Sequence, residues 1–243
     1  MKAAIHAEWT KLRTVAGPAW LLLSALVLTV ALSALASASR TCSTAACGID
    51  PTKISLTGVQ LGQAIIAVLA VLVVGNEYNT GMIRTTLAAI PRRSVALAAK
   101  AVVLVGPVLL AGSVAAAGSL LAGHGFPLAS ATTLRAGAGS ALYLGLIALL
   151  SLGIATAVRD SAAAIGIVLG LLYLFPILAS VVSNSHWQRH VEQIGPSSAG
   201  LAVQATVGLA ALPISPWAGL GVLGLWAAGA LFLGGLLLKF RDA

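Results

Sequence analysis

Six long runs of apolar residues, separated by shorter polar segments, dominate the chain. Each run meets or approaches the roughly 20 residues that a helix needs to cross about 30 Å of hydrocarbon. The runs are continuously rich in Leu, Ala and Val, whereas the strands of a membrane barrel alternate between apolar and polar positions. The pattern predicts one all-α transmembrane domain over residues 1–243, with six transmembrane helices at about residues 20–37, 56–75, 95–122, 136–158, 162–183 and 217–238.

The segment before the first run, MKAAIHAEWTKLRT, has a helical periodicity of its own. Its apolar side chains fall at helical spacing on one face: Ile5, Trp9, Leu12 and Ala16. The spacing predicts an amphipathic interface helix over residues 1–17, with Trp9 at headgroup depth and with Lys11 and Arg13 in the same segment. A plain basic anchor that only fixes the topology explains the same residues.

The polar segments farther along the chain differ in character. Cys42 and Cys47, between the first two runs, are predicted to lie on the outer face, where a disulfide can form, although two free thiols fit the spacing as well. Residues 184–216 are too broken by Gly and Pro for a further span and too apolar for a free loop. They predict an outer re-entrant or surface-lying hairpin before the last span. Pro176 is expected to kink the fifth span.

Composition agrees with a membrane protein. Hydrophobic residues make up 59% of the chain and charged residues 8%, and the mean hydropathy is +1.01, whereas soluble domains carry roughly 25% charged residues. The net charge of +8 raises the question of nucleic acid, but no basic stripe interleaved with aromatic residues occurs. The basic groups instead punctuate the apolar runs, which favours membrane lipids, and not nucleic acid, as their partners.

Lys and Arg are distributed unequally between the two sides of the predicted spans. With six spans both termini lie on one side, where ten basic residues are found: Lys2, Lys11, Arg13, Arg84, Arg92, Arg93, Lys100, Arg159, Lys239 and Arg241. Four lie on the other side: Arg40, Lys53, Arg135 and Arg189. Because cytoplasmic flanks carry the excess of Lys and Arg, both termini are predicted to be cytoplasmic. A cleavable signal ending near residues 36–38 is the alternative, but this run is longer than a typical signal core.

Residues that carry chemistry are scarce. No predicted span has an acidic residue in its core, which argues against an ion-coupled carrier and against an intramembrane protease. His186 and His190 are one helical turn apart, but no Glu lies between them as a zinc helix requires. The chain also lacks the glycine-rich loop and Lys that bind nucleotide phosphates. No catalytic, cofactor or metal site is predicted, so any energy for transport must come from another polypeptide.

Two pairs of glycines have the small-x-x-x-small spacing that permits close helix contacts. They are Gly58 with Gly62 and Gly166 with Gly170. With 26 glycines in the chain, such pairs arise easily by chance. The sequence therefore assigns no dimer face.

One polar island, NEYNTGMIRTTLAAIPRR at residues 76–93, lies between the second and third runs. Asn79 or Thr80 can cap a short helix that Pro91 ends, and Ser94 can cap the third span. Ile83, Leu87 and Ile90 fall on one face of this short helix. A basic loop that only enforces orientation is the alternative. The capped amphipathic helix is favoured because it presents polar groups where a soluble partner can act on two spans. In the same way Asp160 or Ser161 can cap the fifth span.

Three segments carry a resemblance to a known family: EWTKLRT before the first span, NEYNTGMIRTTLAAIPRRSVALAAK between the second and third, and VRDSAAAIG between the fourth and fifth. They resemble the membrane subunits of type 2 ATP-binding-cassette (ABC) exporters, in particular bacterial ones. The most specific element is the pattern E-Y-x-x-G-x-I-R-T-T-L, formed by Glu77, Tyr78, Gly81, Ile83, Arg84, Thr85, Thr86 and Leu87. In architecture the resemblance covers the whole chain.

The resemblance implies a permease of the bacterial plasma (inner) membrane that forms a translocation pathway as a homodimer or with a second permease. It also implies separate cytoplasmic ABC ATPase subunits that hold ATP and Mg, with no cofactor in this chain. The helix at residues 79–90 becomes a cytoplasmic coupling helix. ATPase coupling is assigned by resemblance to Glu77, Tyr78, Asn79, Thr80, Gly81, Ile83, Arg84, Arg92 and Arg93.

A different class of protein fits the same sequence. A non-catalytic membrane scaffold or an immunity-type protein that acts by binding also needs few polar residues in its spans. An ATPase that co-purifies with the chain distinguishes the permease from this alternative. The cargo stays open among drugs, lipids, peptides and polysaccharides, because small polar and aliphatic residues suit several amphiphiles.

Overall fold

In a computed structural model of the chain, the structure describes residues 1–39, 50–90, 92–123, 130–181 and 185–240. Within these residues it is helical and has no strand, and six helical segments are long and apolar enough to cross a membrane. The prediction of an all-α protein with six spans is therefore confirmed. Cys42 and Cys47 lie outside the described residues, and the disulfide between them stays a prediction.

The helices have the following bounds: α1 Lys2–Thr14, α2 Ala16–Ala38, α3 Pro51–Ser55, α4 Val59–Asn79, α5 Met82–Ala89, α6 Arg93–Ala122, α7 Ala131–Val158, α8 Ser161–Leu169, a π-helical turn Gly170–Leu174, α9 Phe175–Val181, α10 Ser185–Ile194, α11 Pro196–Leu201, 3-10 turns Ala202–Gln204 and Leu209–Ala211, and α12 Pro216–Phe240. The six spans are α2, α4, α6, α7, the segment Ser161–Leu178 and α12. Each overlaps one of the predicted apolar runs.

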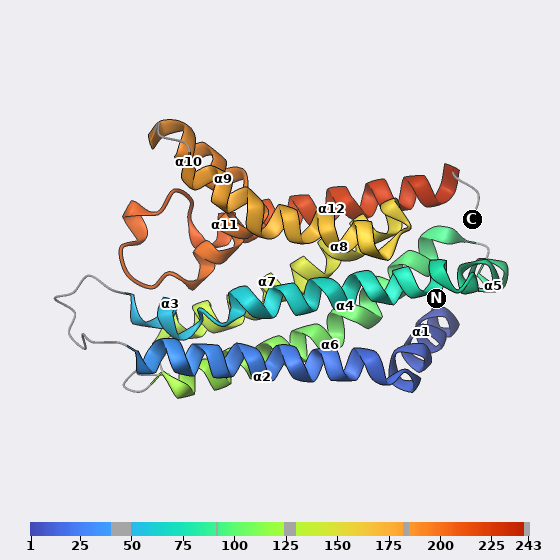
Figure 1. Ribbon diagram of the computed structural model, residues 1–243, viewed down its shortest axis with the longest axis horizontal. Helices are drawn as coiled ribbons and strands as arrows, with labels where there is room; N and C mark the ends of the chain where they lie inside the picture. Colours follow the sequence, from blue (N-terminus) through green and yellow to red (C-terminus); the bar gives the residue numbers. More distant parts are fainter. Residues whose placement is uncertain (40–49, 91, 124–129, 182–184, 241–243) are drawn as a thin grey trace.

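The spans run along the long axis of the molecule, and α7 forms the centre of the bundle (Figure 1). This helix packs on α4, α6 and α12, and its largest buried side chains include Tyr143, Ile147 and Leu150. The α1 and α5 helices lie at the end where α12 finishes, which we call the terminal end (Figure 1). The α3 and α10 helices lie at the other end, which we call the far end.

A sharp bend separates α1 from α2 (Figure 1). Val15 between them has an extended backbone, with φ −94° and ψ 122°. Pro18 lies in the first turn of α2, where its missing N–H costs nothing, but a helix continuous with α1 would need that N–H and would bring the ring against the carbonyl of Thr14. The N-terminal segment is consequently a separate helix at the terminal end. Its position in a lipid interface stays a prediction.

The predicted irregularity in the fifth span is a π-helical turn that ends just before Pro176. Proline cannot donate a hydrogen bond to the carbonyl four residues earlier, which is that of Leu172. The hydroxyl of Ser197, from α11, donates to this carbonyl at 2.8 Å, and the bond is buried. Residue 197 thus supplies a donor where the helix itself has none, and it ties the long segment after α10 to the fifth span.

Residues 196–205 of this long segment are largely buried, in contact with α7 and α12. Glycine allows the close approach: a Cβ on Gly200 would lie 2.6 Å from the Tyr143 ring, and one on Gly219 would lie 2.0 Å from the carbonyl oxygen of Ala199. The guanidinium of Arg135 also donates to the carbonyl of Ala205. These contacts fix the segment on the bundle, whereas its entry into a bilayer stays a prediction.

The two glycine pairs have different surroundings. A Cβ on Gly58 would lie 2.0 Å from the carbonyl oxygen of Thr29, and one on Gly62 would lie 2.2 Å from the Thr29 hydroxyl. This pair therefore permits close packing of α4 on α2 within the chain. A Cβ on Gly166 or on Gly170 would meet no atom within 4 Å among the described residues, so no intramolecular contact explains that pair.

At the far end, Asp50 joins α3 to the segment before α12. Its carboxylate caps α3 by accepting from the Lys53 N–H at 3.2 Å, and it also accepts from the Thr206 hydroxyl at 2.7 Å and from the Val207 N–H at 3.0 Å. Burial alone raises the pKa of the Asp50 carboxyl, but these donors, with the Thr206 N–H, outweigh burial and lower the pKa below its ordinary value. The charged carboxylate is thus the form that holds the two segments together.

The lowered pKa of Asp50 predicts a pH dependence of stability. A carboxyl whose pKa is lower in the folded state stabilises the fold above its unfolded pKa of about 3.9, and the contribution is lost as the pH falls through the folded pKa. We expect thermal unfolding in detergent to show a smaller loss of stability below about pH 4 for Asp50→Asn than for the wild type. Equal losses in the two proteins would contradict this role of the carboxylate.

Candidate functional site

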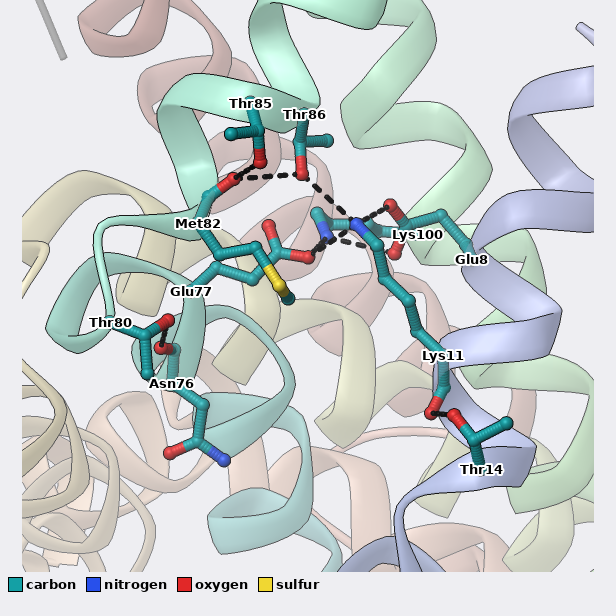
Figure 2. A network of polar contacts seen from close by, with 10 residues as sticks. All are labelled: Glu8, Lys11, Thr14, Asn76, Glu77, Thr80, Met82, Thr85, Thr86 and Lys100. Carbon is teal, nitrogen blue, oxygen red and sulfur yellow. Dashed lines mark hydrogen bonds and ion pairs between the residues drawn. The ribbon is translucent and has the colours of Figure 1, made fainter.

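Four charged side chains from three helices meet at the terminal end of the bundle (Figure 2). Glu8 and Lys11 come from α1, Glu77 from the last turn of α4, and Lys100 from the second turn of α6. The hydroxyl of Thr86 on α5 joins them. We call these five residues the ion-pair cluster. They are brought together by packing, because the helices that carry them are well separated in the sequence.

The contacts within the ion-pair cluster are short. Lys11 Nζ lies 2.9 Å from Glu8 Oε1 and 2.8 Å from Glu77 Oε1, and it donates to the Thr86 hydroxyl at 3.0 Å. Lys100 Nζ lies 2.8 Å from Glu8 Oε2 and 2.6 Å from the same Glu77 oxygen. Each lysine therefore bridges both glutamates, and the formal charges cancel.

Three of the charged residues are almost fully buried. Glu77, Glu8 and Lys100 are exposed by only 3%, 4% and 5%, so the expectation that the spans bury no charge is wrong at their terminal end. Buried charges are tolerated when they are paired and hydrogen-bonded, and here every charge has two partners of opposite sign. The remaining Glu77 oxygen, Oε2, is an exception: it is buried with no hydrogen-bond partner among the described residues.

Lys11 is the most accessible charge of the cluster, with 32% of its side chain exposed. Burial on its own lowers the pKa of the ammonium. Hydrogen bonds to Glu77 and Glu8, together with their negative charges, outweigh burial and raise the pKa above its ordinary value. Lys11 therefore stays charged at neutral pH and keeps α1 attached to α4.

The α5 helix has its expected place but a different start. Gly81, not Asn79 or Thr80, occupies the N-cap position, with φ +70° and no side-chain cap. A left-handed residue is needed where the chain turns from α4 into α5, and glycine adopts it without a steric penalty. Asn79 instead donates to the hydroxyl of Ser161 at 3.0 Å, and the Thr80 hydroxyl donates to the carbonyl of Asn76 at 2.7 Å.

The two faces of α5 differ in burial. Ile83 and Thr86 are buried, whereas Arg84 and Thr85 are exposed. The helix ends at Ala89. Ser94 does not cap the next helix, because α6 begins at Arg93 with no side-chain cap. The Asp160 carboxylate does cap α8, as predicted, by accepting from the Ala163 N–H at 2.7 Å.

The remaining candidates for ATPase coupling point in different directions. Arg92 is exposed, but the guanidinium of Arg93 donates to the carbonyl of Leu238 at the end of α12. Tyr78 is half-buried, and the guanidinium of Arg159 lies 5.7 Å from the centre of its ring. Arg93 and Tyr78 thus contact the bundle itself, so they are not open to a soluble partner in the way that Arg92 is.

The α1 helix buries a different face from the one its apolar periodicity indicates. Ala4 and Glu8 are buried, whereas Trp9 is 45% exposed and Arg13 is exposed. The polar face with Glu8 and Lys11 packs on the bundle because it carries the partners of Glu77 and Lys100. Trp9 is left available to lipid or to another protein.

Sequence reasoning identifies Glu77 and Lys11 but misses three members of the cluster. It gives Glu8, Thr86 and Lys100 no site role, and it counts Lys100 only as a topology signal. One signal is available: an ionisable residue inside an apolar run marks a functional or paired position. Within the described residues no group of three or more His, Cys, Asp or Glu could hold a metal ion.

Comparison with known protein families gives a match over most of the chain. The profile described as ABC-2 family transporter protein matches residues 4–184. The chain belongs to this family. It is therefore a multi-pass membrane permease of an ABC transporter, as its sequence resemblance implied. The match includes all five residues of the ion-pair cluster. No curated protein matches the chain.

Charge balance in the cluster of this ABC-2 permease predicts the effect of removing one lysine. Lys100→Met leaves two buried carboxylates with Lys11 alone, and breaking a buried pair costs about 3–5 kcal/mol. Reversible unfolding of the purified chain in mixed micelles measures this loss. Lys11→Met is the matched variant, and its cost is expected to be smaller because water reaches that position.

A double variant tests whether the loss comes from charge imbalance. Glu8→Gln with Lys100→Met removes one charge of each sign and retains the contact between Lys11 and Glu77. We expect it to recover most of the stability that Lys100→Met loses. A double variant less stable than Lys100→Met alone would show that packing, and not charge balance, sets the cost.

Proposed function

We propose that this permease is the membrane subunit of an ATP-driven exporter. Two permease chains, identical or different, form the pathway, and separate cytoplasmic ATPase subunits bind ATP and Mg and dock at the terminal end. On this proposal the protein lies in the bacterial plasma membrane with both termini in the cytoplasm, consistent with the excess of Lys and Arg on that side.

The observation that carries the proposal is the connection between a surface helix and the spans. The hydroxyl of Thr86 on α5 accepts from Lys11, which also contacts Glu77 on α4, and Glu77 contacts Lys100 on α6. A force applied to α5 by a docked subunit therefore reaches two spans through short charged contacts. A connected set of rigid helices and ion pairs of this kind is the physical means by which a switch is transmitted.

The exposed residues around α5 suit an acidic partner. Arg84 and Arg92 are exposed beside the buried face of the helix, and Trp9 and Arg13 are exposed on α1. Complementary charge guides docking and fixes its register. Arg93 is excluded from this surface because it donates to the end of α12.

The distribution of burial among the spans supports a dimer. The first span, α2, and the fifth span, Ser161–Leu178, are the least buried of the six. Both pack on α4 within the chain, yet their remaining surfaces carry exposed large apolar side chains such as Val27 and Ile167. A second permease chain that covers these faces would complete the pathway.

Co-purification tests the proposal. The wild-type chain, isolated from its host in mild detergent, is expected to bring an ATPase subunit with it. Arg84→Gln with Arg92→Gln is expected to reduce the recovered ATPase about tenfold, since two exposed ion pairs are worth up to about 1 kcal/mol each. Lys53→Gln with Arg189→Gln, which removes two exposed charges at the far end, is the matched control and should retain the ATPase.

Two outcomes would contradict the proposal. Recovery of the wild-type chain alone, without nucleotide hydrolysis in several lipid mixtures, would favour a membrane protein that acts only by binding. Equal loss of ATPase in the Arg84/Arg92 and Lys53/Arg189 double variants would show that the α5 surface has no special role in docking.

A further inference from the structure

A partly open pocket adjoins the ion-pair cluster, in the wedge between α1, α2, α4 and α6. Its volume is about 150 Å³, roughly ten times the minimum space that one ordered water needs. Apolar side chains from all four helices form most of its wall, among them Leu12, Leu21, Leu69, Leu72, Val73 and Val103. Glu77, Lys11 and Lys100 line the same pocket, so an apolar wall ends on charged groups.

The charged end of the pocket lacks a hydrogen-bond donor. Glu77 Oε1 accepts from both lysines, but Oε2 has no partner among the described residues and is buried. Both oxygens of Glu8 are engaged by Lys11 and Lys100. A buried carboxylate oxygen without a donor costs free energy, and such an atom in a native protein calls for a missing partner.

The chemistry of this missing partner follows from the charges around it. An anionic group would add a negative charge beside Glu77 and would find Lys11 already directed at Glu8, Glu77 and Thr86. A group with N–H or O–H donors fits, and a cationic donor fits best because charge-assisted hydrogen bonds are the stronger ones. The apolar wall requires that hydrocarbon follow this group.

The position of the pocket indicates where such a molecule comes from. Glu77 and Lys100 lie at the ends of two spans, at the depth where lipid headgroups meet the hydrocarbon. Met82, which lines the same pocket and is 43% exposed, is drawn with Glu77 in Figure 2. Its flexible thioether chain can move aside to admit a headgroup.

We propose that this pocket binds the primary ammonium headgroup of an aminophospholipid from the surrounding leaflet, which donates to Glu77 Oε2 while the adjoining hydrocarbon packs on Leu72 and Val73. The bound lipid completes the hydrogen bonding of the carboxylate that joins α4 to α1 and α6. The site makes the stability of the cluster depend on the lipid, whether or not an ATPase docks.

Native mass spectrometry of the purified chain tests the proposal. The delipidated protein is titrated with a short-chain phosphatidylethanolamine, with the phosphatidylcholine of the same chains, and with glycerophosphoethanolamine, which has no chains. The choline lipid retains the phosphate but its trimethylammonium has no N–H donor. We expect the ethanolamine lipid to bind about tenfold more tightly than the choline lipid, the lower range for a hydrogen bond to a charged group, and the chainless compound not to bind.

Two variants locate the binding. Leu72→Trp fills the pocket without touching the charged residues, and it is expected to abolish the preference for ethanolamine lipid. Leu110→Trp is the matched control, because Leu110 is 72% exposed on α6 and outside the pocket, and it should bind as the wild type does. Thermal unfolding of both variants verifies that they are folded.

Three outcomes would overturn the proposal. Equal binding of the ethanolamine and choline lipids would mean that water satisfies Glu77 and that the pocket is a general lipid groove. Binding of glycerophosphoethanolamine as tight as that of the lipid would indicate a site for soluble amines. An unchanged lipid preference in Leu72→Trp would place the binding elsewhere on the chain.

Discussion

The requirement that buried charges be paired governs the terminal end of this protein. Glu8, Glu77 and Lys100 are nearly inaccessible to water, and an isolated charge at such a site would cost several kcal/mol. Each lysine contacts both glutamates, so the position of each helix depends on the others. The α1 helix turns its polar face inward for this reason, and α5 is held through Thr86.

The far end uses a different means to hold irregular backbone. There Asp50 accepts hydrogen bonds from the segment before α12, Arg135 donates to the carbonyl of Ala205, and Ser197 donates to the carbonyl that Pro176 leaves without its helical donor. Backbone polar groups away from water must be satisfied internally. The result is a bundle with a fixed charge cluster at one end and a hydrogen-bonded cap of irregular chain at the other.

The spans and the short α5 helix are predictable from sequence because apolar periodicity and length are local properties. The ion-pair cluster is not, since Lys100 and Glu8 are 92 residues apart and only packing brings them together. Asp50 and Thr206 are likewise 156 residues apart. The predicted start of α5 is wrong because polar residues that can cap a helix precede Gly81, whose left-handed backbone makes the turn instead. Lys100, a lysine inside an apolar run, is the one local clue to the cluster.

The central claim is that Glu77 transmits movement of α5 to the spans. Spin labels at Leu61 on α4 and Leu134 on α7, both exposed near the far end, report the distance between these helices in the complex with its ATPase. The account predicts that an ATP analogue shifts this distance in the wild type and that Glu77→Gln loses the shift while retaining bound ATPase. The same shift in the Glu77→Gln complex would contradict it.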